Sequence, residues 1–137
     1  NLIGTFLATK MAHEMLQRAE YGRVINLASI FSTVTYPHRL SYSSSKGGVL
    51  LFSKTIALEW AEQNITVNTI SPGPLLTDIN RKVLDDPDNY KKFCERIPMR
   101  RFGEPHEVVT SALFLASPYS SYITGSDIIV DGGWTSS

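Results

Sequence analysis

Two spacings of hydrophobic residues alternate along the chain, and they predict helices and buried strands. Apolar residues recur at the helical period between Leu2 and Leu16, and again over residues 41–63, so both stretches are predicted helices. Unbroken apolar runs occur instead in GRVINLAS (22–29) and ITVNTISPGP (65–74). Such runs are typical of strands buried on both faces of a parallel sheet. Gly47 and Gly48 weaken the second helix, so either a neighbouring element or ligand comes close to it or a well-packed helix simply tolerates them.

The second half of the chain continues this alternation. Residues 78–94 predict a helix that is interrupted at 86–88 and is rich in charge, so we expect a peripheral, lid-like segment. GEPHEVVTSALFLAS (103–117) predicts a helix, because Pro105 suits a first helical position and Glu107 complements the positive end of the helix dipole. SDIIVDGG (126–133) predicts a short third strand.

The order of these elements predicts an α/β fold. Strands separated by helices require right-handed crossovers, and therefore a parallel sheet with helices on both faces. Three strands are few for that architecture. We therefore expect residues 1–137 to form the C-terminal half of a doubly wound, Rossmann-like sheet, with the N-terminal dinucleotide-binding half absent.

Charge and cysteine content narrow the classes of partner. Thirteen basic and thirteen acidic residues cancel without runs of like charge, so we expect neither nucleic acid nor a membrane as partner. Small molecules and other proteins remain. The single cysteine, Cys94, and three scattered histidines indicate no metal site and favour a reducing, cytoplasmic location. No apolar stretch is long enough to cross a bilayer.

The segment YSSSK (42–46) carries the first candidate chemistry. Tyr42 and Lys46 are four residues apart and so lie on one face of the predicted helix. A phenol has a pKa near 10. A nearby ammonium stabilises the phenolate and so lowers this pKa toward neutral pH, where the phenol can act in acid-base catalysis. Alone, a Tyr-x-x-x-Lys pair is more often an exposed surface pair. However, Ser29 and the Pro72–Gly73 turn follow the first two strands at the sheet edge where open parallel sheets bind ligands.

These segments together resemble a known family. NLAS (26–29), YSSSK thirteen residues after Ser29, VNTISPGPLLT (67–77) and YITGSDIIVDGG (122–133) are similar in order and spacing to the classical short-chain dehydrogenases/reductases. The resemblance covers nearly the whole chain. It implies an NAD(P)-dependent oxidoreductase that interconverts a carbonyl and a secondary alcohol by hydride transfer, with NAD or NADP as cofactor.

The resemblance also implies roles for single residues. Tyr42 becomes the proton donor or acceptor at the substrate oxygen, and Ser29 the hydroxyl that orients that oxygen. Lys46 stabilises the phenolate and binds the nicotinamide ribose. Asn1 falls on the family's asparagine that holds a water in the proton relay; the alternative is that Asn1 is only a frayed helix end.

Further residues of the implied site bind cofactor and substrate. Pro72 and Gly73 resemble the turn beneath the nicotinamide, Leu75 the residue whose backbone meets the carboxamide, and Thr77 a hydroxyl that contacts the cofactor. The expected substrate-binding residues are Ser29, Phe31, His38 and Pro74, with Arg39 beside His38. Asn26 is expected to hold strands together, and Asp131–Gly133 to form a structural turn near a subunit interface.

Several questions stay open. The chain has no counterpart of the family's glycine-rich turn or of its cofactor-selecting residues, so the choice between NAD and NADP is undecided. For the same reason we expect the chain alone to be inactive. Its unpaired sheet edge is expected to promote aggregation. Sugars, sugar acids and 3-oxoacyl groups are the candidate substrates, and the polar region before Tyr42 favours the first two. Such members are usually tetramers or dimers. The alternatives are a non-catalytic binding or regulatory protein, a structural chain, and a serine hydrolase, which the surroundings of Ser29 disfavour.

Overall fold

Three parallel strands form one sheet at the centre of the molecule. The computed structural model describes residues 1–136, and in it β1 (Gly22–Leu27), β2 (Ile65–Pro72) and β3 (Asp127–Val130) are hydrogen-bonded in the order β1-β2-β3. Gly22 pairs with Ile65 and Thr69 with Asp127, so the carboxyl ends of the strands meet at one edge. The predicted parallel α/β fold is confirmed.

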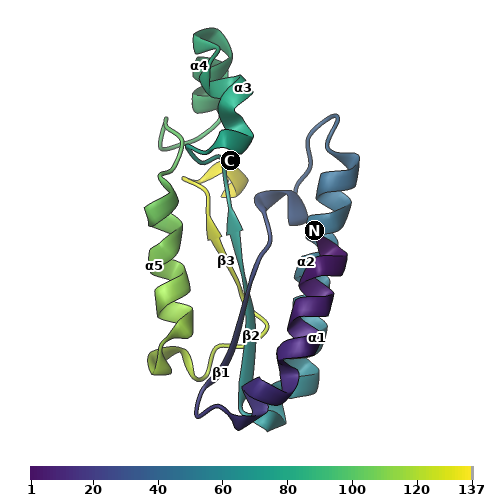
Figure 1. The fold of residues 1–137 in the computed structure, drawn as a ribbon. Helices are drawn as coiled ribbons and strands as arrows, with labels where there is room; N and C mark the ends of the chain where they lie inside the picture. The colour runs from purple at the N-terminus through teal and green to yellow at the C-terminus, as the bar shows by residue number, and fades with distance from the viewer. Residues whose placement is uncertain (137) are drawn as a thin grey trace.

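Helices cover both faces of this sheet (Figure 1). Helices α1 (Leu2–Arg18) and α2 (Leu40–Trp60) lie on one side, and α5 (Pro105–Ala116) lies on the other. On the α2 side, Ala57 and Trp60 pack with Ile65 and Val67 of β2. On the α5 side, Ile70 of β2 packs with residues of α5 such as Leu115. The short 3-10 helices are Ile30–Ser32, Ala61–Gln63, Asp78–Asn80, Pro118–Ser120 and Trp134–Ser136.

The two long strands differ in burial, which corrects one prediction. Strand β2 is buried throughout except at Pro72, as its apolar run predicted. Strand β1 is only partly buried, and Leu27 at its end is 58% exposed. The reason is position, because β1 lies at the edge of the described sheet and pairs with β2 alone. A continuous apolar run predicts a strand, whereas its burial depends on its neighbours.

The charged segment after β2 lies beyond the carboxyl ends of the strands (Figure 1). It forms α3 (Arg81–Leu84) and α4 (Pro87–Glu95), so the segment is interrupted as predicted, but at residues 85–86, and Pro87 already begins α4. The Asp86 side chain caps α4 by accepting a hydrogen bond from the Asn89 backbone N–H at 3.1 Å. The segment is not only peripheral, because Phe93 and Cys94 pack with Ile30, Phe102 and Trp134 in a hydrophobic cluster.

The two helix glycines of α2 have different surroundings. A Cβ on Gly48 would lie 2.8 Å from a methyl group of Leu2, so α1 approaches α2 closely at this point. A Cβ on Gly47 would meet only the Ser32 carbonyl oxygen, at 3.6 Å, which is ordinary contact. The expected close approach therefore occurs at Gly48.

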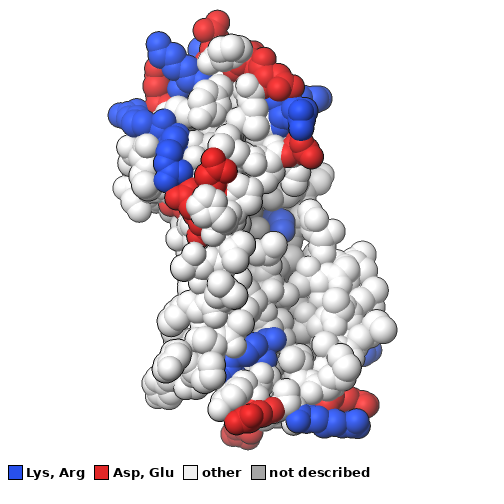
Figure 2. Space-filling model, turned by 60° about the vertical axis from the view of Figure 1, so that its left-hand side comes forward, with Lys and Arg blue, Asp and Glu red and all other residues white. Residues whose placement is uncertain are grey.

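Charged side chains are unevenly spread over the surface of the described residues. In Figure 2 the charged side chains gather toward the two ends of the molecule and leave a mostly uncharged middle. No helix of residues 1–136 is long and apolar enough to cross a membrane. The same residues contain no group of three or more His, Cys, Asp or Glu side chains arranged to hold a metal ion.

Candidate active site

A cleft of about 400 Å³ lies at the carboxyl ends of β1 and β2. Its walls come from the loop after β1, the first turns of α2, the turn after β2, and α3, α4 and the C-terminal turn. Ligands bind at this edge of open parallel sheets. The predicted site residues that line the cleft are Ser29, Phe31, Tyr42, Lys46, Pro72, Gly73, Pro74, Leu75 and Thr77.

Tyr42 and Lys46 share one face of α2, as their spacing predicted. The Lys46 Nζ lies 5.9 Å from the centre of the Tyr42 ring. It also donates a hydrogen bond to the Leu27 carbonyl oxygen at 2.6 Å, which holds the lysine against the end of β1. Burial lowers the pKa of Lys46, because desolvation disfavours the charged ammonium. Tyr42 is 37% exposed and faces the cleft.

Ser29 also lines the cleft, and its hydroxyl proton is not used in any hydrogen bond of the described residues. The residue is only 6% exposed, and its Oγ accepts a hydrogen bond from the Phe31 backbone N–H at 3.2 Å. The Ser29 backbone N–H in turn donates to the Ser32 Oγ at 3.2 Å, which fixes the turn after β1. Within residues 1–136 the Ser29 hydroxyl donates to no group, so it can donate to a ligand. The Phe31 ring meets the Tyr42 ring edge-on, with 6.2 Å between centroids.

Asn1 lies beside α2 but does not line the cleft. Its Nδ2 donates to the Ser45 Oγ at 3.1 Å, and the Ser45 hydroxyl donates to the Tyr42 carbonyl oxygen at 2.8 Å. Asn1 is thus attached to the segment between Tyr42 and Lys46. Its predicted water-holding role stays a prediction.

The turn after β2 lines the cleft and contains an unpaired backbone N–H and an unpaired hydroxyl among the described residues. Gly73 is held by a hydrogen bond from its N–H to the Val130 carbonyl oxygen at 2.9 Å. Among the described residues, neither the Leu75 N–H nor the Thr77 hydroxyl has a hydrogen-bond partner. A free donor and a free hydroxyl in one turn fit the amide of a nicotinamide.

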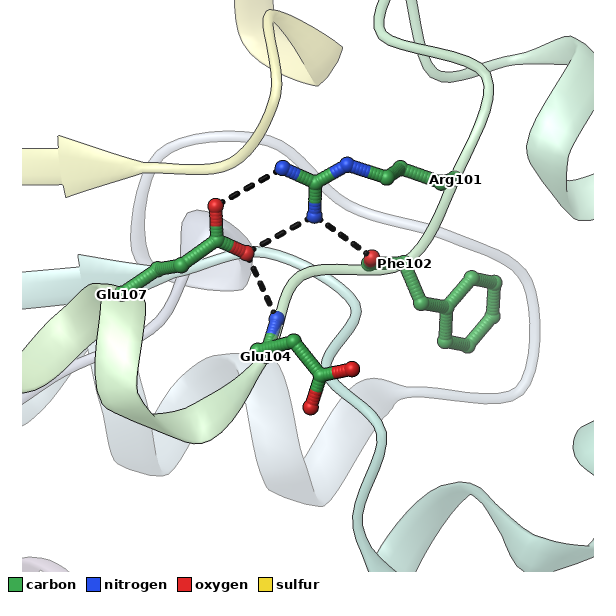
Figure 3. A network of polar contacts seen from close by, with 4 residues as sticks. All are labelled: Arg101, Phe102, Glu104 and Glu107. Carbon is green, nitrogen blue, oxygen red and sulfur yellow. Dashed lines mark hydrogen bonds and ion pairs between the residues drawn. The ribbon is translucent and has the colours of Figure 1, made fainter.

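An ion pair fixes the segment next to this turn (Figure 3). Arg101 donates two hydrogen bonds to the Glu107 carboxylate, at 2.8 and 2.7 Å, and the Glu104 N–H donates a third at 2.7 Å. These donors lower the pKa of Glu107 to about 2, with the bond from Arg101 as the largest cause. The Arg101–Glu107 ion pair positions Gly103, whose N–H donates to the Pro74 carbonyl oxygen at 2.9 Å. The sequence predicted a dipole role for Glu107 and missed its pairing with Arg101.

The remaining predicted residues have mixed placements. His38 does not line the cleft, whereas its neighbour Arg39 does. The Asn26 side chain was expected to hold strands together. Instead its Nδ2 donates to the Ser53 Oγ at 2.9 Å and connects β1 to α2. The Asp131 carboxylate accepts hydrogen bonds from backbone N–H groups of the C-terminal turn, which confirms a structural turn there. Sequence reasoning missed the aromatic wall residues Tyr36, Phe93, Phe102 and Trp134.

A parallel sheet with a serine, a tyrosine and a lysine around a cleft at its carboxyl edge defines a Rossmann-type protein with a candidate oxidoreductase site. The comparisons agree with this class. Residues 1–135 match the family model described as enoyl-(acyl carrier protein) reductase. The chain belongs to the short-chain dehydrogenase/reductase family.

The chain is similar to named relatives in sequence and to solved structures in fold. The chain is 38% identical over 98% of its length to glucose 1-dehydrogenase 2 of Bacillus subtilis, covering 52% of that protein. It is 40% identical over its whole length to carbonyl reductase [NADPH] 2 of Sus scrofa, covering 57% of it. A gluconate 5-dehydrogenase from Burkholderia cenocepacia, solved with NADP and tartrate, superimposes with a TM-score of 0.95 at 32% identity over 99% of this chain and 53% of that one. The chain therefore spans about half the length of the curated relatives it matches.

Proposed function

We propose that this chain carries the catalytic half of an NAD(P)-dependent oxidoreductase that interconverts a carbonyl and a secondary alcohol. The candidate substrates are sugars, sugar acids and 3-oxoacyl groups. Because the relatives are about twice as long, we propose that the dinucleotide-binding half of the complete gene product lies outside residues 1–137. By itself the chain is expected to be inactive.

The proposed catalytic groups are Ser29, Tyr42 and Lys46. Tyr42 transfers a proton to or from the substrate oxygen, and Ser29 donates a hydrogen bond to that oxygen as negative charge develops on it. The ammonium of Lys46, close to the Tyr42 ring, stabilises the phenolate when the proton leaves. Asn1 is proposed to act through the segment around Ser45, as the residue that orients a water for proton exchange.

Residues of two segments would hold the nicotinamide cofactor. The Leu75 N–H and the Thr77 hydroxyl would bind the carboxamide end, and Lys46 would bind the ribose. Pro72 and Gly73 would form the floor beneath the ring, while Phe31 and Pro74 would limit the space left for substrate. When bound, the nicotinamide supplies or accepts the hydride.

Exposed apolar surface supports assembly into a homo-oligomer. Leu51 and Leu58 of α2 are 67% and 82% exposed, and Met11 of α1 is 81% exposed. A second group includes Val109 and Leu113 of α5, which are 51% and 67% exposed on the other side of the sheet (Figure 1). Two separate apolar surfaces favour a dimer or tetramer. Sedimentation velocity of the complete gene product would measure the assembly directly.

The observation that carries the proposal is the convergence of Ser29, Tyr42 and Lys46 on one cleft with the Pro72–Thr77 turn. The test is Tyr42→Phe in the complete gene product, followed by NAD(P)H consumption with a panel of carbonyl substrates. Removal of the acid-base group is expected to lower kcat by about 10²- to 10⁴-fold. Binding of NAD(P)H, measured by fluorescence titration, should persist. Equal turnover by both proteins would contradict the proposal.

A further inference from the structure

The charged side chains that line the active-site cleft are few, and all of them are cationic. They are Arg39 and Lys46, and no Asp or Glu of residues 1–136 lines the cleft. Most of the remaining wall is apolar or aromatic and includes Phe31, Phe93 and Trp134. Lys46 is partly buried and Arg39 is exposed, and with no carboxylate in the cleft wall to compensate them, the two cations favour an anionic ligand over a neutral one.

The two cations lie on opposite sides of Tyr42. Lys46 is bonded to the Leu27 carbonyl oxygen, and the proposed function assigns it to the phenolate and the nicotinamide ribose. Arg39 precedes Tyr42 by three residues and is the N-cap residue of α2. Seven residues of helix separate the two backbone positions by about 10 Å along the axis, and Lys46 already has a partner in Leu27, so Arg39 is left for a second group of the ligand.

The Arg39 side chain is also without an interaction partner among the described residues. Among the described residues its guanidinium makes no hydrogen bond, ion pair or ring contact, whereas Arg81 and Arg101 each pair with a carboxylate. A free guanidinium offers a planar fork of donors that matches both oxygens of a carboxylate. The side chains of residues three apart on a helix are neighbours, so Arg39 can hold one end of a ligand while Tyr42 holds the other.

We infer that the substrate carries a carboxylate and that Arg39 binds it while Tyr42 and Ser29 hold the reacting oxygen. The inference rests on the proposed function and narrows its substrate class. It selects sugar acids and other oxo or hydroxy acids, and it disfavours neutral sugars and polyols, which leave the Arg39 charge uncompensated.

The test compares acids with their own esters. The complete gene product is assayed for NAD(P)H-dependent reduction of pyruvate, acetoacetate and levulinate, each beside its methyl ester. In these pairs the carbonyl lies at increasing distance from the carboxylate. We expect at least one acid to exceed its ester in kcat/KM. That acid-to-ester ratio should fall by about 10- to 100-fold in Arg39→Gln, the loss typical of one charge-assisted hydrogen-bonded pair.

Two further variants separate charge from structure. Arg39→Lys keeps the charge without the fork and should give an intermediate ratio. Arg18→Gln, at an exposed position near the end of α1 and outside the cleft, should leave the ratio and the activity unchanged. If Arg39→Gln does not fold by circular dichroism, added KCl replaces it, because screening should lower the ratio of the unmodified protein.

The outcomes distinguish this inference from the proposed function. An acid-to-ester ratio that is the same in Arg39→Gln as in the unmodified protein would overturn the inference. So would reduction of esters or cyclohexanone without preference for any acid. If no carbonyl compound is reduced at all, the proposed function fails. Calorimetric titration with levulinate then tests Arg39 by itself, since the unmodified protein should bind it and Arg39→Gln should not.

Discussion

Replacement of Gly73 by alanine tests whether the turn after β2 is fixed by its packing against β3. A Cβ on Gly73 would lie 2.7 Å from the Asp131 Cα and 3.2 Å from the Asp131 carbonyl oxygen. Asp131 cannot move freely, because its carboxylate accepts hydrogen bonds from the Gly133 and Thr135 N–H groups at 2.8 Å. The turn itself must therefore shift, which also strains the bond from the Gly73 N–H to the Val130 carbonyl oxygen.

The expected loss is about 2 to 4 kcal/mol in the free energy of unfolding. Overpacking of a close contact costs about 1 to 3 kcal/mol, and a weakened hydrogen bond adds about 1 kcal/mol. Urea denaturation of the complete gene product would measure this loss. Because the displaced turn carries Leu75 and Thr77, the Kd for NAD(P)H should rise as well.

Gly47→Ala is the matched control. The new methyl group meets only the Ser32 carbonyl oxygen, at 3.6 Å. An alanine inside a helix is favoured over glycine by about 1 kcal/mol, so this variant should be as stable as the unmodified protein or more stable. A Gly73→Ala variant that loses no stability relative to Gly47→Ala would refute the packing argument.

Three further predictions follow from single contacts. Lys46→Met should lower kcat and weaken NAD(P)H binding, as measured by steady-state kinetics and fluorescence titration, because it removes the cation near Tyr42 and the bond to Leu27; unchanged kinetics would contradict the proposed role. Glu107→Gln should destabilise the protein at neutral pH. The pKa of Glu107 falls from 4.5 to about 2 on folding, so its stabilisation is complete above about pH 4.5 and is lost as pH falls toward 2. The Tm values of Glu107→Gln and the unmodified protein should therefore converge over that pH window in thermal unfolding. Ser53→Ala leaves the Asn26 side chain without its acceptor and should cost about 1 to 3 kcal/mol in urea denaturation, whereas Thr55→Ala on the exposed face should cost little.

Local patterns in the sequence predicted the elements of the fold well. The helical period located α1 and α2, Pro105 and Glu107 located α5, and the apolar runs located β1 and β2, because each signal reflects the geometry of its own element. The burial of β1 was not predictable in the same way, since it depends on which strands lie beside it. The close contact at Gly48 likewise involves Leu2, forty-six residues away, and only the folded structure identifies it.

The candidate site likewise contains residues that local patterns predict and residues that only the folded structure brings together. Tyr42 and Lys46 were predicted from their spacing on one helix, and Ser29 and Gly73 from their positions after strands. Much of the rest of the cleft wall comes from α4, the segment before α5 and the C-terminal turn, which no local pattern links to the site. Arg101 and Glu107 are six residues apart, with a turn between them, so no helical or strand period predicts their pairing.

The central claim is that Ser29 and Tyr42 act as one unit on a single substrate oxygen, and a double-mutant cycle on kcat tests it most directly. The complete gene product would be compared with Ser29→Ala, Tyr42→Phe and the double variant under the same conditions. When two groups act together, removing both lowers kcat little more than removing the more important one alone. We predict that the double variant is about as slow as Tyr42→Phe alone. Losses that multiply would contradict the account, because they would show that the two side chains act independently.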